Sequence, residues 1–338
     1  MKPDHSGPLP AAASARISSG PIGTSERPLR RAAGFVDAVL RGIGQVMLQD
    51  NRVTGLVFLV GIFYNSALFG CAVLLGTTAS TATAILLGVD RSQVRAGLFG
   101  FNGALVAIAL LYFLQPTPLA WAYVVLAAAG TTVLMAALMN LLSTWKLPAL
   151  TAPFVFTTLL FVLACARFGR LQTTGFLPTA GLPKATTVEG IVTFSTVAEG
   201  LFNGIAQVFF QGNVVTGVLF ALGLLIASRL AFVAALGGSL TGLLVAWGMG
   251  AAEPAIRAGA FGFNPVLTAI ALCGVFFVAN AASTAYGLLG VIVTAVVFAA
   301  LSAALEPLGM PALTLPFVLV TWCFVAAGPL FPRLRATR

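Results

Sequence analysis

Amide, hydroxyl and helix-breaking residues recur in pairs along this chain of 338 residues, each time inside an apolar stretch. The amide and hydroxyl side chains donate and accept hydrogen bonds but carry no charge, so they suit the binding of a neutral polar solute. Their order and spacing are the first clue to what they do. The pairs are Gln-Val-Met-Leu-Gln at 45–49 with Gln-Val-Phe-Phe-Gln at 207–211, Phe-Gly-Phe-Asn at 99–102 and 261–264, and Leu-Pro-Ala-Leu-Thr at 147–151 with Met-Pro-Ala-Leu-Thr at 310–314.

The spacing of these pairs indicates an internal duplication. Subtracting residue numbers gives an offset of 207 − 45 = 162 for the glutamine motifs, 261 − 99 = 162 for the Phe-Gly-Phe-Asn motifs, and 314 − 151 = 163 for the threonines. Three motifs in one order at a nearly constant offset predict two copies of one unit. We assign the first repeat to 34–170, a connecting loop to 171–200, and the second repeat to 201–331.

The asparagines of the Phe-Gly-Phe-Asn motifs predict that a helix starts there. Asn102 and Asn264 are preferred N-cap residues, and Pro265 follows at a position where proline is tolerated. The preceding segment is then a separate short helix or an irregular piece that ends at membrane depth, where it has to be buried in protein or line a polar cavity. The alternative is that the glycines only allow helices to pack closely.

Two prolines add a second break to each copy. Pro153 and Pro316 lack a backbone donor, so we expect free carbonyls four residues earlier, at Ala149 and Ala312. Thr151 and Thr314 place hydroxyls beside these breaks and are candidates for the centre of a pore. The alternative is a kinked span whose threonine binds its own backbone.

The glutamines suggest the mouth of such a pore. Gln45 and Gln49 are four residues apart, as are Gln207 and Gln211, so each pair shares one face of a helix. Leu48 and Phe210 add an apolar surface beside the amides. The alternative assigns these glutamines to the solvated membrane interface.

Composition places the chain in a bilayer. It is 59% hydrophobic and 8% charged, with a mean hydropathy of +1.01, which is outside the range of soluble domains. Strand-like alternation is absent, so helices cross the membrane. We expect an all-α membrane protein, with about five apolar segments in each repeat and ten transmembrane helices in all. Examples are 53–76, 119–142, 214–228 and 286–305, with shorter segments at 150–166 and 313–327.

The charge pattern predicts the topology. Nine of the 18 Lys and Arg residues flank the first and last spans, which places both termini in the cytoplasm. We expect 1–33 to be a disordered cytoplasmic tail and 332–338 a short cytoplasmic one. The net charge of +9 therefore indicates membrane anchoring rather than nucleic acid binding. Five spans per copy would insert the second repeat the opposite way up, so the repeats are expected to be inverted.

The scarcity of histidine and acidic residues restricts the chemistry of the chain. The one histidine is His5, in the tail, and the acidic residues lie near the ends of the predicted segments. Proton-coupled transport, a metal site, a cofactor and an enzyme's acid–base pair are therefore not expected. A flat, neutral diamide fits a lining of carbonyls, hydroxyls, amides and aromatic faces. Channels for short amides, ammonia or water stay open as alternatives, as does a cation-coupled secondary transporter.

At these motifs the sequence resembles the urea transporter family, in both halves and in the same order. The resemblance implies passive, channel-like urea flow through one pore per protomer of a homotrimer, with one re-entrant half-helix in each repeat besides the five spans. It also implies a location in the plasma membrane, here the bacterial inner membrane. It implies outer binding sites at Gln45 and Gln207, apolar slots from Leu48, Phe101, Leu105, Phe210, Phe263 and Leu267, and a midpoint lined by Thr151 and Thr314.

Overall fold

The computed structural model describes residues 26–183 and 187–337, and the secondary structure of this part of the chain is helical. Its only β-pairing consists of two isolated bridges. The first half contains α1 (Glu26–Gln45), α2 (Arg52–Asn65), α3 (Ala67–Leu86), α4 (Arg91–Arg95), α5 (Phe101–Phe113), α6 (Pro118–Ser143) and α7 (Ala152–Cys165). The second half contains α8 (Phe194–Ala206), η1 (Gln207–Phe209), α9 (Val214–Ala227), α10 (Arg229–Gly248), α11 (Glu253–Arg257), α12 (Phe263–Ile270), the π-helix η2 (Ala271–Val275), α13 (Ala281–Leu305), η3 (Glu306–Leu308), α14 (Leu315–Ala327) and η4 (Gly328–Leu330).

The helix boundaries follow the offset of the sequence motifs. The first residues of α2 and α9 differ in number by 214 − 52 = 162, and those of α4 and α11 by 253 − 91 = 162. The same side chains cap corresponding helices: Asn51 and Asn213 begin α2 and α9, and Ser66 and Ser228 begin α3 and α10. Side-chain oxygens at these positions accept the otherwise unpaired N–H groups of the first turn.

The π-helix explains why the offset changes to 163. For Asn102 and Asn264 the offset is 264 − 102 = 162, whereas the carbonyls of Tyr112 and Val275, which accept matching threonine hydroxyls, differ by 275 − 112 = 163. One residue has therefore been added between 264 and 275. The backbone N–H of Phe276 binds the carbonyl of Ala271, five residues back, and such a widened turn accommodates one extra residue.

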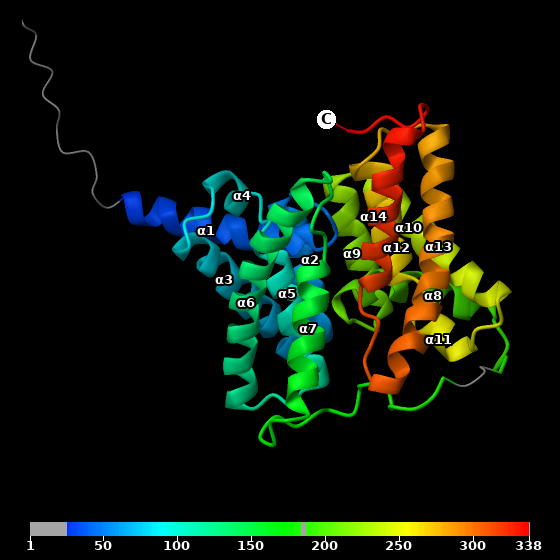
Figure 1. Cartoon of the computed structure of the whole chain (residues 1–338), viewed down its shortest axis with the longest axis horizontal. Helices are drawn as coiled ribbons and strands as arrows, with labels where there is room; N and C mark the ends of the chain where they lie inside the picture. The colour runs from blue at the N-terminus through cyan, green and yellow to red at the C-terminus, as the bar shows by residue number, and fades with distance from the viewer. Residues whose placement is uncertain (1–25, 184–186, 338) are drawn as a thin grey trace, which may run out of the picture.

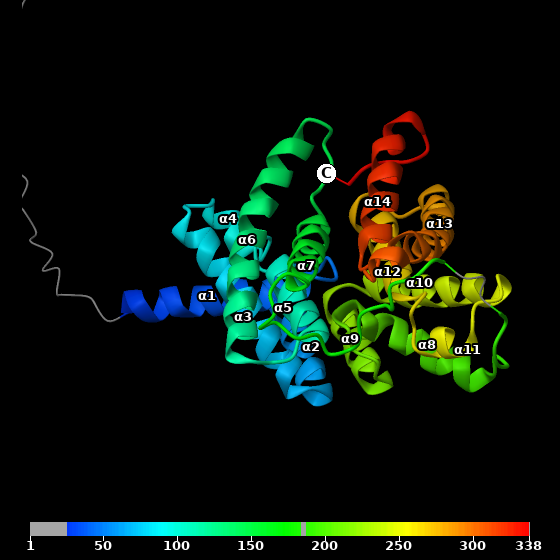
Figure 2. The same ribbon diagram turned by 60° about the horizontal axis from the view of Figure 1, so that its bottom comes forward.

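The two halves lie side by side and meet at α2 and α9 (Figures 1 and 2). Thr54 Oγ1 donates to the carbonyl of Gly223 at 2.8 Å, and Thr216 Oγ1 donates to that of Gly61 at 3.1 Å. These contacts are reciprocal, because 216 − 54 and 223 − 61 both equal 162. Reciprocal contacts of this kind are typical of two units related by a two-fold axis.

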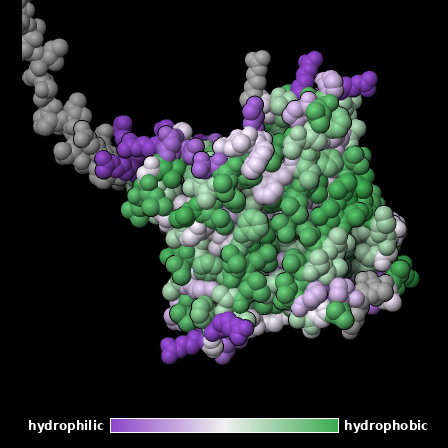
Figure 3. Space-filling model, in the orientation of Figure 1, coloured by the Kyte–Doolittle hydropathy of each residue, from purple (hydrophilic) through white to green (hydrophobic). Residues whose placement is uncertain are grey.

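Within residues 26–183 and 187–337, four helices are long and apolar enough to cross a membrane, or five if the bent pair α8–α9 counts as one span. Between the hydrophilic ends of the molecule, Figure 3 shows a broad band of apolar residues. The ten expected spans require the shorter apolar helices to cross as well, and that number stays a prediction. The long helices are Ala67–Leu86, Pro118–Ser143, Arg229–Gly248 and Ala281–Leu308.

Three expectations about segment boundaries are wrong. Residues 53–76 do not form one span, because Ser66 is extended and separates α2 from α3. Residues 26–33, expected in the disordered tail, form the first part of α1. The expectation for 1–25 lies outside the described residues. The connecting loop, expected at 171–200, is shorter, because α8 begins at Phe194.

Candidate functional site

Thr151 and Thr314 lie against each other where the two halves meet. Their hydroxyl oxygens are 2.7 Å apart, and each residue is 3% exposed. Each precedes a helix, α7 or α14, as its N-cap residue. The preceding leucines, Leu150 and Leu313, both have φ of +50°, which is an uncommon conformation for a residue with a side chain. The chain thus turns sharply into each helix and brings the two hydroxyls together.

The prolines begin helices, so the alternative of a kinked span is wrong. Pro153 and Pro316 lie in the first turns of α7 and α14, where a missing N–H leaves no helix bond unmade. The carbonyls of Ala149 and Ala312, which we expected to be free, accept the N–H groups of Ala152 and Leu315 at 3.2 and 3.1 Å. These two oxygens are therefore already bonded within tight turns.

The asparagines of the Phe-Gly-Phe-Asn motifs cap a different helix from the one expected. Helices α5 and α12 begin at Phe101 and Phe263, and no side chain caps them. Asn264 instead donates to the carbonyl of Leu313 at 3.0 Å and accepts the N–H of Phe317 at 3.1 Å. Asn102 makes the matching bonds to Leu150 and Phe154, at 3.3 and 3.1 Å. Each asparagine therefore clamps the turn that presents a central threonine.

A glycine just before each of these motifs is needed for a close approach. Gly97 and Gly259 have φ of +75° and +76°. A Cβ at either position would lie 2.3 Å from a backbone nitrogen, that of Gly42 or Gly204 respectively. Only glycine combines that backbone conformation with such close packing. These contacts place the segments after α4 and α11 against the ends of α1 and α8.

The glutamines do not share helix faces as expected, because α1 and α8 end before the second glutamine of each motif. Gln45 and Gln207 donate to the carbonyls of Ala96 and Ala258, at 2.9 and 3.2 Å. Gln49 and Gln211 are buried, and each donates to a backbone carbonyl two residues back. Leu48 and Phe210 cause this divergence, since both are left-handed, with φ of +61° and +58°.

A cavity of about 250 Å³ lies in the second half, near the boundary between the halves. Four of the ten residues singled out in the sequence line it together: Gln207, Phe210, Phe263 and Thr314. The other lining residues are Phe154, Pro178, Val208, Phe298, Ser302, Pro311, Ala312 and Leu313. None of the twelve is charged, so the cavity suits a neutral guest.

Aromatic rings form much of the cavity wall. Phe210 extends from the second half towards first-half rings and lies edge-to-face with Phe154, at 6.4 Å between ring centroids and 84°. Phe263 lies edge-to-face with Phe298 at 5.5 Å and 82°. Phe154 stands in the Leu-Pro-Ala-Leu-Thr-Ala-Pro-Phe motif and could have been selected from the sequence. Phe298 and Ser302 lie in a uniform apolar run that contains no motif, so the sequence carried no signal for them.

The remaining six candidates do not line this cavity. Leu105 and Leu267 are fully buried, and Phe101 is 7% exposed. Gln45 and Leu48 are partly exposed at the corresponding end of the first half, and Thr151 contacts Thr314, which lines the cavity. Among the described residues, no group of three or more His, Cys, Asp or Glu side chains could hold a metal ion.

Comparison with known proteins identifies the family of this chain. The family model for the urea transporter matches residues 36–329. The chain is 32% identical to urea transporter 1 of Ovis aries over 302 residues, which cover 87% of this chain and 77% of that protein; the same figures hold for the protein of Capra hircus. It is 31% identical to urea transporter 1 of Rattus norvegicus over 298 residues, which cover 86% and 76% of the two chains. This multi-pass membrane protein therefore belongs to the urea transporter family.

Proposed function

We propose that this protein is a channel-like transporter that lets urea cross the membrane passively through a pore within each protomer. The observation that supports this most is the contact between Thr151 and Thr314, where two clamped helix starts from the two halves meet beside an uncharged cavity. Urea is small, flat and neutral, with N–H donors and a carbonyl acceptor. Hydroxyl, amide and aromatic groups can replace its hydration shell.

Two inverted repeats would explain the reciprocal contacts between the halves. In this proposal, each repeat contributes five spans and one re-entrant half-helix, and both termini face the cytoplasm. The family match to urea transporters and the matching helix boundaries support a common pore on the axis between the repeats. We also propose that the protein forms homotrimers in the plasma membrane, the inner membrane if the host is a bacterium.

The uncharged lining favours uncoupled flow over cation coupling. A charged group at membrane depth costs about 2.5–3.5 kcal/mol on permissive scales, and coupled transporters carry such groups because they bind the driving ion. The lining residues of the cavity that have polar side chains are Gln207, Ser302 and Thr314. A solute that binds these groups can pass in either direction down its own gradient.

The direct test measures urea entry into proteoliposomes by stopped-flow light scattering. We expect purified protein to speed urea entry, and we expect the rate to stay the same when a proton or sodium gradient is imposed. A rate that follows either gradient would establish the coupled transporter instead. Entry of acetamide or glycerol with no urea entry would establish a channel for another neutral solute.

The Gln207→Leu variant tests the proposed mouth of the pore. The Gln207 amide lines the cavity and is held by the Ala258 carbonyl, so its oxygen can accept an N–H of the solute. A net hydrogen bond contributes about 0.5–1.5 kcal/mol, so we expect a rise of roughly 2- to 12-fold in the half-saturating concentration of a urea analogue such as methylurea. Gln115→Leu, at an exposed position away from the cavity, is the matched control. An unchanged value in folded Gln207→Leu protein would remove this glutamine from the site.

A further inference from the structure

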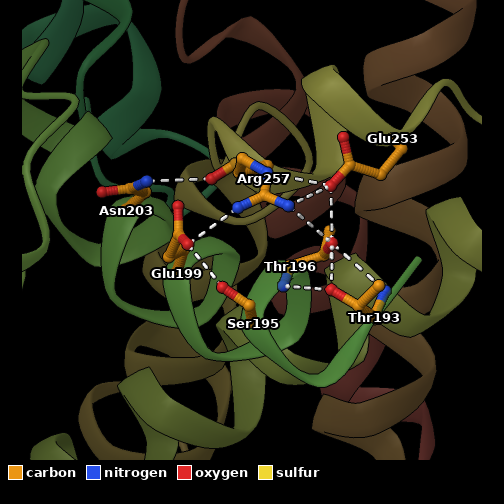
Figure 4. A network of polar contacts seen from close by, with 7 residues as sticks. All are labelled: Thr193, Ser195, Thr196, Glu199, Asn203, Glu253 and Arg257. Atoms are coloured by element: carbon orange, nitrogen blue, oxygen red, sulfur yellow. Dashed lines mark hydrogen bonds and ion pairs between the residues drawn. The ribbon is translucent and has the colours of Figure 1, made fainter. Parts of the chain in front are cut away.

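A cluster of charged and hydroxyl side chains joins α11 to α8 (Figure 4). The Arg257 guanidinium binds Glu199 of α8 at 2.7 Å and Glu253 of its own helix at 2.8 Å. It also donates to the Thr196 hydroxyl at 3.2 Å, and this hydroxyl in turn binds Glu253. We call these four residues the Arg257 cluster. Its contacts hold a five-residue helix that is too short to be stable by itself.

The same short helix ends in two carbonyls that are bound by amides of α8 and η1. Asn203 donates to the carbonyl of Arg257 at 2.8 Å, and Gln207 donates to that of Ala258 at 3.2 Å. These two amides are four residues apart and so follow one another along one helix face. Gln207 is also a lining residue of the cavity. Any shift of α11 therefore moves the carbonyl that orients the Gln207 amide.

We call the ion pairs by which Arg257 joins α11 to α8 the arginine clamp. In the first half, the counterpart of Arg257 makes no such link, although the counterpart of Gln207 keeps its contact with a backbone carbonyl. Arg95 is the counterpart of Arg257 at the offset of 257 − 95 = 162, but its side chain donates to the carbonyl of Arg91 in its own helix, at 3.3 Å. Asp37, the counterpart of Glu199, pairs instead with Arg41 and Arg52, at 2.8 and 3.6 Å. Gln45 still donates to the Ala96 carbonyl. The chain thus contains the same amide contact with and without an arginine clamp.

We propose that Arg257, through its ion pair with Glu199, is a positioning residue that sets the affinity for urea at the second-half mouth by fixing the Gln207 amide. This inference rests on the proposed function. A fixed amide binds a solute without first losing rotational freedom, whereas a loose one loses that freedom on binding. The clamp therefore acts on affinity and leaves the central threonines unchanged.

The cluster is ionised at neutral pH, so substitutions made there test its charges. Hydrogen bonds from Thr196 and then Arg257 lower the pKa of Glu253, and hydrogen bonds to Glu253 and then Glu199 raise the pKa of Arg257. Both shifts favour the charged forms. Measurements at pH 7 therefore compare an intact clamp with one that a substitution has opened.

The test compares Arg257→Gln with Arg95→Gln as its matched control and Arg257→Lys as a rescue. Using methylurea as the probe in proteoliposomes, we expect Arg257→Gln to raise the half-saturating concentration about 3- to 10-fold, from the cost of ordering one side chain. Arg95→Gln should change it less than two-fold, and Arg257→Lys should recover part of the loss. When Gln207 is already leucine, Arg257→Gln should have little further effect. Glu199→Gln should reproduce the phenotype if Arg257→Gln does not fold.

Two readouts separate this inference from the proposed function. Hydrogen exchange of the backbone amides from 253 to 262 reports the clamp without any solute, and it should rise in Arg257→Gln. Faster exchange with unchanged affinity would show a merely structural role and overturn the inference, as would effects of Arg257→Gln and Gln207→Leu that simply add. No urea flux in the wild-type protein would overturn the proposed function itself.

Discussion

Replacing Thr151 and Thr314 together by valine is expected to slow urea entry about 100-fold while the protein stays folded. A desolvated polar group that lacks its partner costs about 1–3 kcal/mol, so losing two hydroxyls raises the barrier by about 2–6 kcal/mol. A change of about 1.4 kcal/mol in the barrier is a factor of ten in rate, so the lower part of that range already gives the expected effect. The loss falls on flux because both hydroxyls lie where the two halves meet.

The fold should tolerate this double change because the two hydroxyls bind each other. Their oxygens are 2.7 Å apart, and valine has nearly the same shape as threonine. Replacing both partners of a hydrogen bond by apolar groups of the same shape can be nearly neutral, whereas a single substitution leaves one hydroxyl unpaired. We therefore expect Thr151→Val alone to be less stable than the double variant.

The measurement is stopped-flow urea entry, with thermal unfolding in detergent as the folding control. A variant with serine at both positions keeps the hydroxyls and should retain most of the flux. If the double valine variant is folded and carries urea at the wild-type rate, these threonines do not form the midpoint. The Thr151–Thr314 contact would then serve only to join the two halves.

The second large effect is expected for Asn264→Ala, which should lower the free energy of unfolding by about 2–6 kcal/mol, because its two backbone partners lose their bonds. The side chain is fully buried and binds the carbonyl of Leu313 and the N–H of Phe317. Its removal leaves both backbone groups unpaired in the interior, at about 1–3 kcal/mol each. Leu313 is also held in the left-handed region, which persists only where the surroundings enforce it.

Thermal unfolding in detergent measures this loss of stability, and two further variants serve as comparisons. Asn102→Ala removes the matching clamp in the first half and should cost a similar amount, while Asn140→Ala at an exposed position should stay within about 0.5 kcal/mol of the wild type. If Asn264→Ala is as stable as Asn140→Ala, the side chain does not hold the turn. Reduced flux through a variant of normal stability would instead place Asn264 in the pathway.

The membrane class and the family could be obtained from the residues in order, and the repeated motifs predicted a duplication. Apolar content is a property of composition, and the repeated motifs at 45–49 and 207–211 are matched by comparing letters. The presence of a helix break beside each threonine was also evident, because proline is disfavoured inside a helix. Residue type and spacing were enough for these conclusions.

The partners of the motif residues could not be obtained in this way. Asn264 is a good N-cap in any sequence, yet its side chain caps a helix that begins about fifty residues later in the chain. Leu48 and Phe210, which follow the ends of α1 and η1, adopt a left-handed conformation that their residue types do not favour, so the expected shared face of the glutamines was wrong. Local preferences are weak compared with the packing that sets these turns.

The sequence by itself therefore determined that this chain is an apolar helical protein of the urea transporter family, with similar polar motifs recurring at a nearly constant offset. Only the tertiary structure decided that the two threonine hydroxyls touch, that Phe298 joins Phe263 in the cavity wall, and that Arg257 clamps α11 where Arg95 does not clamp α4. The physical reason is that these contacts join residues far apart in the chain, and their geometry depends on how whole helices pack rather than on the preferences of any single residue.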